Sequence, residues 1–234
     1  MQDQLKSDIP AITPALFTFL EELKQNNDRE WFHANKKRYE KEVRNPLLQF
    51  IAGFSGPLSE ISPHYIADPR PVGGSLFRIY RDVRFSKDKS PYKTHAGIQF
   101  RQERGKDAHA PGFYLHFEPG NVFCAAGVWQ PDSSSLNKIR GAIEENPEKW
   151  QKIFSNREFA NTFKPGGDSL KRPPRGFDPD HPFIEDLKRK DFFVITTFSE
   201  ETACSPEFMK TCSNAFKISA PFMRFLNEAL NFEW

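Results

Sequence analysis

Through the first fifty residues, apolar side chains recur at steps of three and four, which places them on one face of a helix. The pattern predicts a first helix over residues 12–25, which the polar stretch "NNDRE" ends. We expect Asn27 to cap a second helix and Glu30 to complete a capping box. Pro46 has no N–H to donate, so a kink or a new helix is expected there. Asn35 lies on the same apolar stripe and is expected to be buried with its hydrogen bonds satisfied.

From Gly73 onward the spacing changes to two, which is typical of strands. "EPGN" supplies a tight turn near residue 119, and short connections between sequential strands favour an antiparallel meander. The predicted strands are "SLFRIYRDVRF" (75–85), "AGIQFRQ" (96–102), "GFYLHFEP" (112–119) and "NVFCAAGVW" (121–129).

The second half of the chain returns to helices. Asp132 or Ser133 is expected to cap one helix, and Asn146-Pro147 to begin another. "KPGGDSLKRPPRGFDPDHP" (164–182) is predicted to be an irregular loop, followed by a strand around "DFFVITTFS" and a last helix that begins at Ser205-Pro206 and is interrupted at Pro221. Together the patterns predict an α+β fold, an antiparallel sheet meander flanked by N-terminal and C-terminal helices, in a single domain over residues 12–234 after a tail over 1–11.

Composition narrows the class of protein. The 24 Phe residues predict a core rich in aromatic rings. Three cysteines without CxxC spacing argue against a disulfide framework and a zinc ribbon. The N-terminus has no apolar signal region, and no apolar run is long enough to cross a membrane. We therefore expect a cytoplasmic protein that does not enter a membrane, while its oligomeric state stays open.

The net charge is only +2, yet "FRIYRDVRFSKDKSPYKTH" (77–95) carries six Lys or Arg against two Asp. If residues 77–85 form a strand, Arg81 falls among the apolar side chains and needs a carboxylate, a bulge or a bound anion. Asp82 is expected to orient one of the neighbouring guanidinium groups. The turn chemistry of "SKDKSP" leaves backbone N–H groups pointing outward, which also suits an anion.

Two interpretations of this stretch stay open. Charge runs are usually solvated surface, with each cation paired to an acid elsewhere. Alternatively, the cations hold a small anionic, phosphate-bearing ligand, and a second basic loop closes over the same place. On the second interpretation the candidate ligand-binding residues are Arg78, Arg81, Asp82, Arg84, Ser86, Asp88, Lys89, Tyr92 and Lys93, with Lys171, Arg172 and Arg175 in the second loop.

Two other functions remain as alternatives. The Pro-rich stretch over residues 170–182 is a candidate surface for protein interaction. "QFRQERGK" (99–106) and the basic loops suggest a nucleic-acid module, against which the near-neutral overall charge argues.

The search for familiar chemistry assigns no catalytic residue. Tyr114, His116 and Glu118 share a predicted strand face that His95 joins, but this spacing is generic, so we expect no metal. No nucleophile elbow, phosphate-binding loop or dinucleotide motif is present, and no cofactor is expected. Whether the ligand is also turned over is left open.

Four stretches stand out together: "FLEELKQNNDREWFHANKKRYE" (19–40), "RIYRDVRFSKDKSPYK" (78–93), "GFYLHFEPG" (112–120) and "LKRPPRGFDPDHP" (170–182). In this order they resemble a known family, the one catalogued as domain of unknown function 2461. The resemblance implies a single α+β domain and carries over no activity. It also implies that the family's signature positions are Arg78, Arg81, Asp82, Arg84, Phe85, Ser86, Asp88, Lys89, Pro91, Tyr92 and Lys93.

Overall fold

The computed structural model describes residues 12–104 and 110–234. The tail expected over residues 1–11 and the last two residues of "QFRQERGK" therefore lie outside the described residues. Helices α1 (Pro14–Gln25), α2 (Arg29–Arg38) and α3 (Asn45–Ile61) open the chain, and a π-helical turn, η2 (Tyr39–Arg44), joins α2 to α3. Pro46 lies in the first turn of α3, so the new helix expected there is confirmed.

The capping box proposed for α2 is wrong by one residue. Asp28 is the N-cap, and its carboxylate accepts a hydrogen bond of 2.9 Å from the backbone N–H of Trp31. Asp and Asn both cap helices well, so the sequence alone did not determine whether Asn27 or Asp28 caps α2. Asn27 does not cap the helix and makes a long-range contact with Tyr92 instead.

Within the described residues the sheet has six strands in the order β1-β2-β3-β4-β6-β5, and every neighbouring pair is antiparallel. The central register aligns Leu115 with Ile98 on one side and with Cys124 on the other. In the hairpin turn between β3 and β4, Gly120 has φ of 73°, which glycine adopts without strain. The antiparallel α+β fold is confirmed. Its strands are β1 (Tyr65–Ile66), β2 (Ala96–Gln102), β3 (Gly112–Glu118), β4 (Asn121–Val128), β5 (Lys164–Gly166) and β6 (Phe192–Phe198).

The remaining helices follow β4 and β6. The expected cap of α4 is confirmed, since the Asp132 side chain accepts a hydrogen bond of 2.6 Å from Ser135 N. The predicted interruption at Pro221 is wrong, because α9 runs through it as one helix. These helices are α4 (Ser133–Glu145), α5 (Pro147–Ser155), α6 (Arg157–Thr162), α7 (Ile184–Leu187), α8 (Glu200–Ala203) and α9 (Phe208–Leu230).

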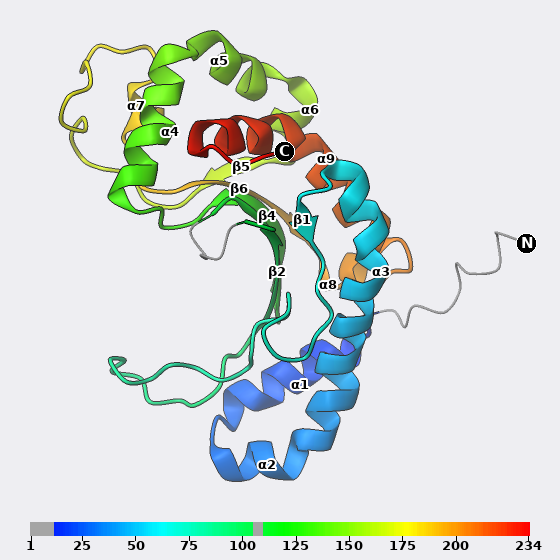
Figure 1. Cartoon of the computed structure of the whole chain (residues 1–234). Coiled ribbons are helices and arrows are strands. Elements are labelled where there is room, and N and C mark those ends of the chain that lie inside the picture. Colours follow the sequence, from blue (N-terminus) through cyan, green and yellow to red (C-terminus); the bar gives the residue numbers. More distant parts are fainter. Residues whose placement is uncertain (1–11, 105–109) are drawn as a thin grey trace, which may run out of the picture.

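The two faces of the sheet have different environments. Figure 1 shows α3 and α9 along one face, while in the described part of the chain no helix lies across the other. On β3, Phe113, Leu115 and Phe117 are fully buried toward the helices, and the alternate residues Tyr114 and His116 point to the open face. The open face is therefore where polar chemistry is available.

The strand predicted over residues 75–85 is wrong. Only isolated bridges form, Leu76 with Ile98 and Tyr80 with Tyr92, and Phe85 is 95% exposed although its position in the pattern is apolar. The chain instead folds back on itself beyond the sheet, as the hydrogen bond from Arg81 N to Pro91 O shows. Residues 79–81 pair with residues 91–93, but this pairing does not extend into a regular ladder because Pro91 has no N–H to donate.

None of the helices in the described ranges combines the length and the apolar character that crossing a bilayer requires.

Candidate ligand-binding cleft

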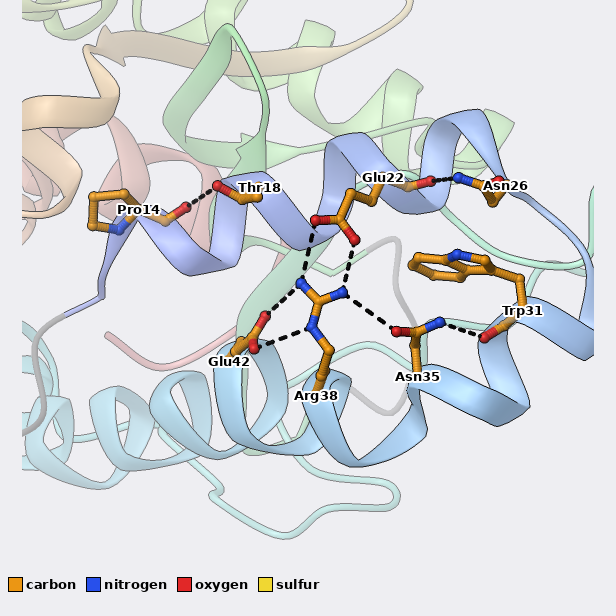
Figure 2. Close-up of polar contacts among 8 residues, drawn as sticks. All are labelled: Pro14, Thr18, Glu22, Asn26, Trp31, Asn35, Arg38 and Glu42. Atoms are coloured by element: carbon orange, nitrogen blue, oxygen red, sulfur yellow. Dashed lines mark hydrogen bonds and ion pairs between the residues drawn. The ribbon is translucent and has the colours of Figure 1, made fainter.

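A bidentate ion pair holds the first two helices together. Figure 2 shows Arg38 reaching from α2 to α1, where its Nη1 lies 2.7 Å from Glu22 Oε2. Glu42, in the π-helical turn, accepts from the same guanidinium group at 3.3 Å. Asn35 accepts from Arg38 and donates to the backbone carbonyl of Trp31 at 2.9 Å. Asn35 is half-buried rather than buried as expected, but its side-chain hydrogen bonds are satisfied. The network fixes the turn between α1 and α2.

That turn anchors the first basic segment, which we define as residues 77–95. The side chain of Asn27 pairs with the backbone of Tyr92 in both directions: its Nδ2 donates to Tyr92 O at 3.0 Å, and its Oδ1 accepts from Tyr92 N at 3.1 Å. The ring of Tyr92 stacks on Phe32 of α2, with centroids 4.1 Å apart. The segment is thus fixed at one point although most of it is irregular.

A cleft of about 580 Å³ lies between the C-terminal end of α1 and the first basic segment. This volume is within the range of small-molecule sites, roughly 300–1,000 Å³. Three cationic and two carboxylate side chains line it, so one positive charge is left over. The lining residues are Lys24, Asn27, Arg81, Asp82, Asp88, Ser90, Tyr92, Lys93, Thr94 and His95.

Two of the arginines already have acids of their own. Arg81 is ion-paired with Asp88 and also donates to Ser90 O at 3.3 Å. Hydrogen bonds from Ser90 and from Arg81 lower the pKa of Asp88. Arg84 lies 2.6 Å from Asp82 in an exposed pair, whose hydrogen bonds lower the pKa of Asp82 to about 2. The carboxylate expected for Arg81 is therefore Asp88, and the guanidinium that Asp82 orients is that of Arg84.

Lys93 differs from these arginines. Its Nζ lies 5.2 Å from the centroid of the Phe77 ring, and no described carboxylate forms an ion pair with it. Burial, and secondarily the charge of Arg78, lower the pKa of Lys93. Arg78 is exposed and likewise has no acidic partner among the described residues. Lys93 is therefore a half-buried ammonium group that lies near a second cation and lacks a compensating negative charge in the described chain.

The other candidates in the segment do not line the cleft. Ser86 lies with its hydroxyl 3.5 Å from Arg81 Nη2, and the exposed Lys89 donates to the backbone carbonyl of Val83 at 3.0 Å. Their contacts are those of a self-contained loop.

The second basic segment, which we define as residues 164–182 and also call the Pro-rich segment, lies elsewhere. Its first three residues form β5 instead of the irregular loop expected there. In Figure 1 its irregular part projects beside α4 and α7, at the opposite end of the sheet from the first basic segment. Lys171, Arg172 and Arg175 are exposed, and none of them lines the cleft. The structure therefore does not bring the two basic segments together.

A polar row continues the cleft onto the open face of the sheet. Tyr114 Oη lies 3.0 Å from His116 Nδ1, and His116 Nε2 lies 3.4 Å from Glu118 Oε2. The ring of His95 stacks on that of His116 with centroids 4.6 Å apart. The four residues considered from sequence as metal ligands do meet, but as a hydrogen-bonded row and a ring stack.

Three potential ligand atoms for a metal ion cluster elsewhere. Side-chain atoms of His64, Glu103 and Glu233 lie within 4.8 Å of one another. His64 Nδ1 is 2.6 Å from Glu103 Oε1, and Arg104 Nη2 lies 3.2 Å from Glu233 Oε2. Since a guanidinium already balances Glu233, this cluster is explained by its own ion pairs.

Sequence reasoning missed five of the lining residues as ligand contacts. They are Lys24, Asn27, Ser90, Thr94 and His95. Lys24 and Asn27 belong to another helix and turn, and no spacing in the sequence connects them to residue 92. His95 could have been found from the sequence, because it is the last residue of the first basic segment and lies two positions after Lys93.

The geometry defines an α+β protein with an antiparallel sheet, one helix-covered face, and a cationic cleft at the edge of its open face. The family model described as conserved hypothetical protein DUF2461 matches residues 15–225. The chain belongs to that family. A comparison with the curated proteins found no match.

Proposed function

We propose that the protein binds a small anionic, phosphate-bearing ligand in the cleft between α1 and the first basic segment. The observation that carries the proposal is Lys93, a half-buried ammonium group in the wall of the cleft with no carboxylate partner in the described chain. Burying an unpaired charge is unfavourable, and a bound anion would remove that cost.

The rest of the lining supports the same ligand class. Lys24 adds positive charge, and Arg81 also lines the cleft while paired with Asp88. The hydroxyl groups of Ser90 and Thr94 line it as well, and they donate to Asp88 at 2.6 Å and to Glu118 at 3.5 Å. Asp88 also lines the cleft, but its charge is compensated by Arg81. Since the charge of Arg81 is balanced by Asp88, the proposal centres on Lys93 and Lys24 rather than on the whole basic run.

Thermal unfolding tests the proposal. Phosphate, sulfate and nucleotides are compared with chloride at matched ionic strength. A ligand at 100 times its Kd stabilises a protein by about 2.7 kcal/mol, which for this size raises Tm by about 5–10 °C. We expect such a rise for the wild type and its loss in Lys93→Gln.

Lys87→Gln is the matched control. It removes one positive charge from the same segment, but Lys87 is exposed and does not line the cleft. The proposal fails if no anion raises Tm beyond chloride, or if Lys87→Gln abolishes the response as fully as Lys93→Gln does.

A further inference from the structure

His95 lines the cleft and stacks on His116 behind it, and the two histidines differ in how their ring nitrogens are satisfied. Both ring nitrogens of His116 are engaged, Nδ1 with Tyr114 and Nε2 with Glu118. His95 lies in the wall of the cleft, and within the described chain neither of its ring nitrogens has a hydrogen-bond partner. An imidazole has one acceptor and one donor nitrogen when neutral, and two donors when protonated. His95 can therefore offer one or two N–H donors to a ligand in the cleft, depending on whether its ring is neutral or protonated.

The groups behind His95 hold its ring in place. The stacked ring of His116 is fixed by its two hydrogen bonds, and Glu118 is itself held by Asn121 Nδ2 at 3.3 Å and Thr94 Oγ1 at 3.5 Å. Glu118 is the carboxylate on this side, and it is already shared among three donors.

The groups in front of His95 are mainly cationic. Lys93 lies two residues before it and lines the same cleft, as do Lys24 and Arg81. The carboxylates of Asp82 and Asp88 also line the cleft, each paired with an arginine. A proton added to His95 would therefore meet positive charge that is not locally compensated.

The electrostatics of the unliganded cleft agree with this picture. Burial, followed by the charges of His116 and Lys93, lowers the pKa of His95 to about 4. The imidazole is neutral at neutral pH for that reason. An anion beside Lys93 would offset the positive charge of Lys93 and so raise the pKa of His95.

We propose that His95 takes up a proton when a dianionic oxyanion occupies the cleft, so that the ligand is held between Lys93 and a protonated His95. This inference rests on the proposed function and adds the ligand class: a dianion, whose second charge is matched by the second cation. If Lys93 alone held the anion, ligand binding would not be coupled to the uptake of a proton.

The sign of the pH dependence follows from linkage. Binding is tightest where the proton is available and weakens as pH rises toward the pKa of the liganded state. If an anion restores the pKa of His95 to an ordinary value of about 6.5, the Kd rises about sevenfold from about pH 5 to about pH 6. Sulfate is the suitable probe, because its own charge stays constant over this range.

Isothermal titration of sulfate into the full chain, in two buffers of different ionisation enthalpy, measures both the Kd and the protons taken up. For the wild type at about pH 5 we expect uptake approaching one proton and a Kd that increases with pH. His95→Gln is expected to bind sulfate with no proton uptake and a Kd that barely changes with pH. His33→Gln, the same substitution at an exposed position on α2, is expected to match the wild type. Circular dichroism at each pH verifies that every variant is folded.

Three results would overturn the inference. A wild-type Kd that is constant across this pH range, without proton uptake, would do so and leave the proposed function standing. Proton uptake that persists in His95→Gln but disappears in His116→Gln would assign the proton to the other ring. No sulfate binding at any pH would overturn both the inference and its basis.

Discussion

The two basic segments of this protein look alike in sequence and differ in the structure. Both are rich in cations, but the first, residues 77–95, has a wall opposite it formed by Lys24 and Asn27, whereas Lys171, Arg172 and Arg175 of the second do not line that cleft. The Pro-rich segment is attached to the end of α7 by hydrogen bonds such as Leu170 N to Lys188 O at 2.7 Å, with Pro174 buried and its cations exposed. Charge density alone does not make a site, because a ligand needs opposed surfaces that exclude water.

The largest effect is expected where the first segment packs on the helices. Phe32 is only 3% exposed and stacks on Tyr92, so Phe32→Ala should lower the free energy of unfolding by about 3–5 kcal/mol. Phe177→Ala is the counterpart in the Pro-rich segment, where the ring is half-buried, and should cost about 1–2 kcal/mol. Urea unfolding measures both. Equal losses would contradict the view that the first segment is the more firmly anchored.

An intermediate effect is expected at Asn27, whose side chain joins the turn between α1 and α2 to the first basic segment. Asn27→Ala removes both hydrogen bonds to the backbone of Tyr92 and should cost about 1–3 kcal/mol, together with weaker sulfate binding as the cleft loosens. Asn26→Ala, next to it, removes one exposed contact with Glu22 O and serves as the control. If the two variants bind sulfate equally well, the contact of Asn27 with Tyr92 does not shape the cleft.

The smallest effect is expected from the cations of the Pro-rich segment. Replacing Lys171, Arg172 and Arg175 together by Gln should change stability by less than about 0.5 kcal/mol, because all three are exposed. Sulfate affinity at physiological ionic strength should stay unchanged, since charges beyond roughly 8 Å are screened. A loss as large as that in Lys93→Gln would mean that this segment reaches the cleft after all.

The interaction surface suggested for residues 170–182 stays a prediction, as does the nucleic-acid alternative. The buried Pro174 and the half-buried Phe177 give part of the Pro-rich segment a packing role. A partner would therefore contact the exposed cations of this segment, Lys171, Arg172 and Arg175. The triple Gln variant also tests for loss of that contact.

Local pattern was enough for most of the architecture. The hairpin of β3 and β4 follows from the two strand patterns that flank "EPGN", and α4 and α5 follow from a capping Asp132 and from Pro147 at a first turn. These features depend on residues a few positions apart, whose steric and hydrogen-bond preferences act within one element. The strand predicted over 75–85 failed because alternation indicates a pleated backbone only where a neighbouring strand completes the ladder.

The cleft was decided by tertiary structure. The sequence by itself showed that cations gather between residues 77 and 95, and that Arg81 would need a counter-charge. It did not show that Asp88 supplies that charge while Lys93 receives none, nor that Asn27, 65 positions before Tyr92, holds the segment in place. The physical reason is that neutralisation and burial depend on distances through space, and only the folded chain sets which cation keeps an acid and which is left without one.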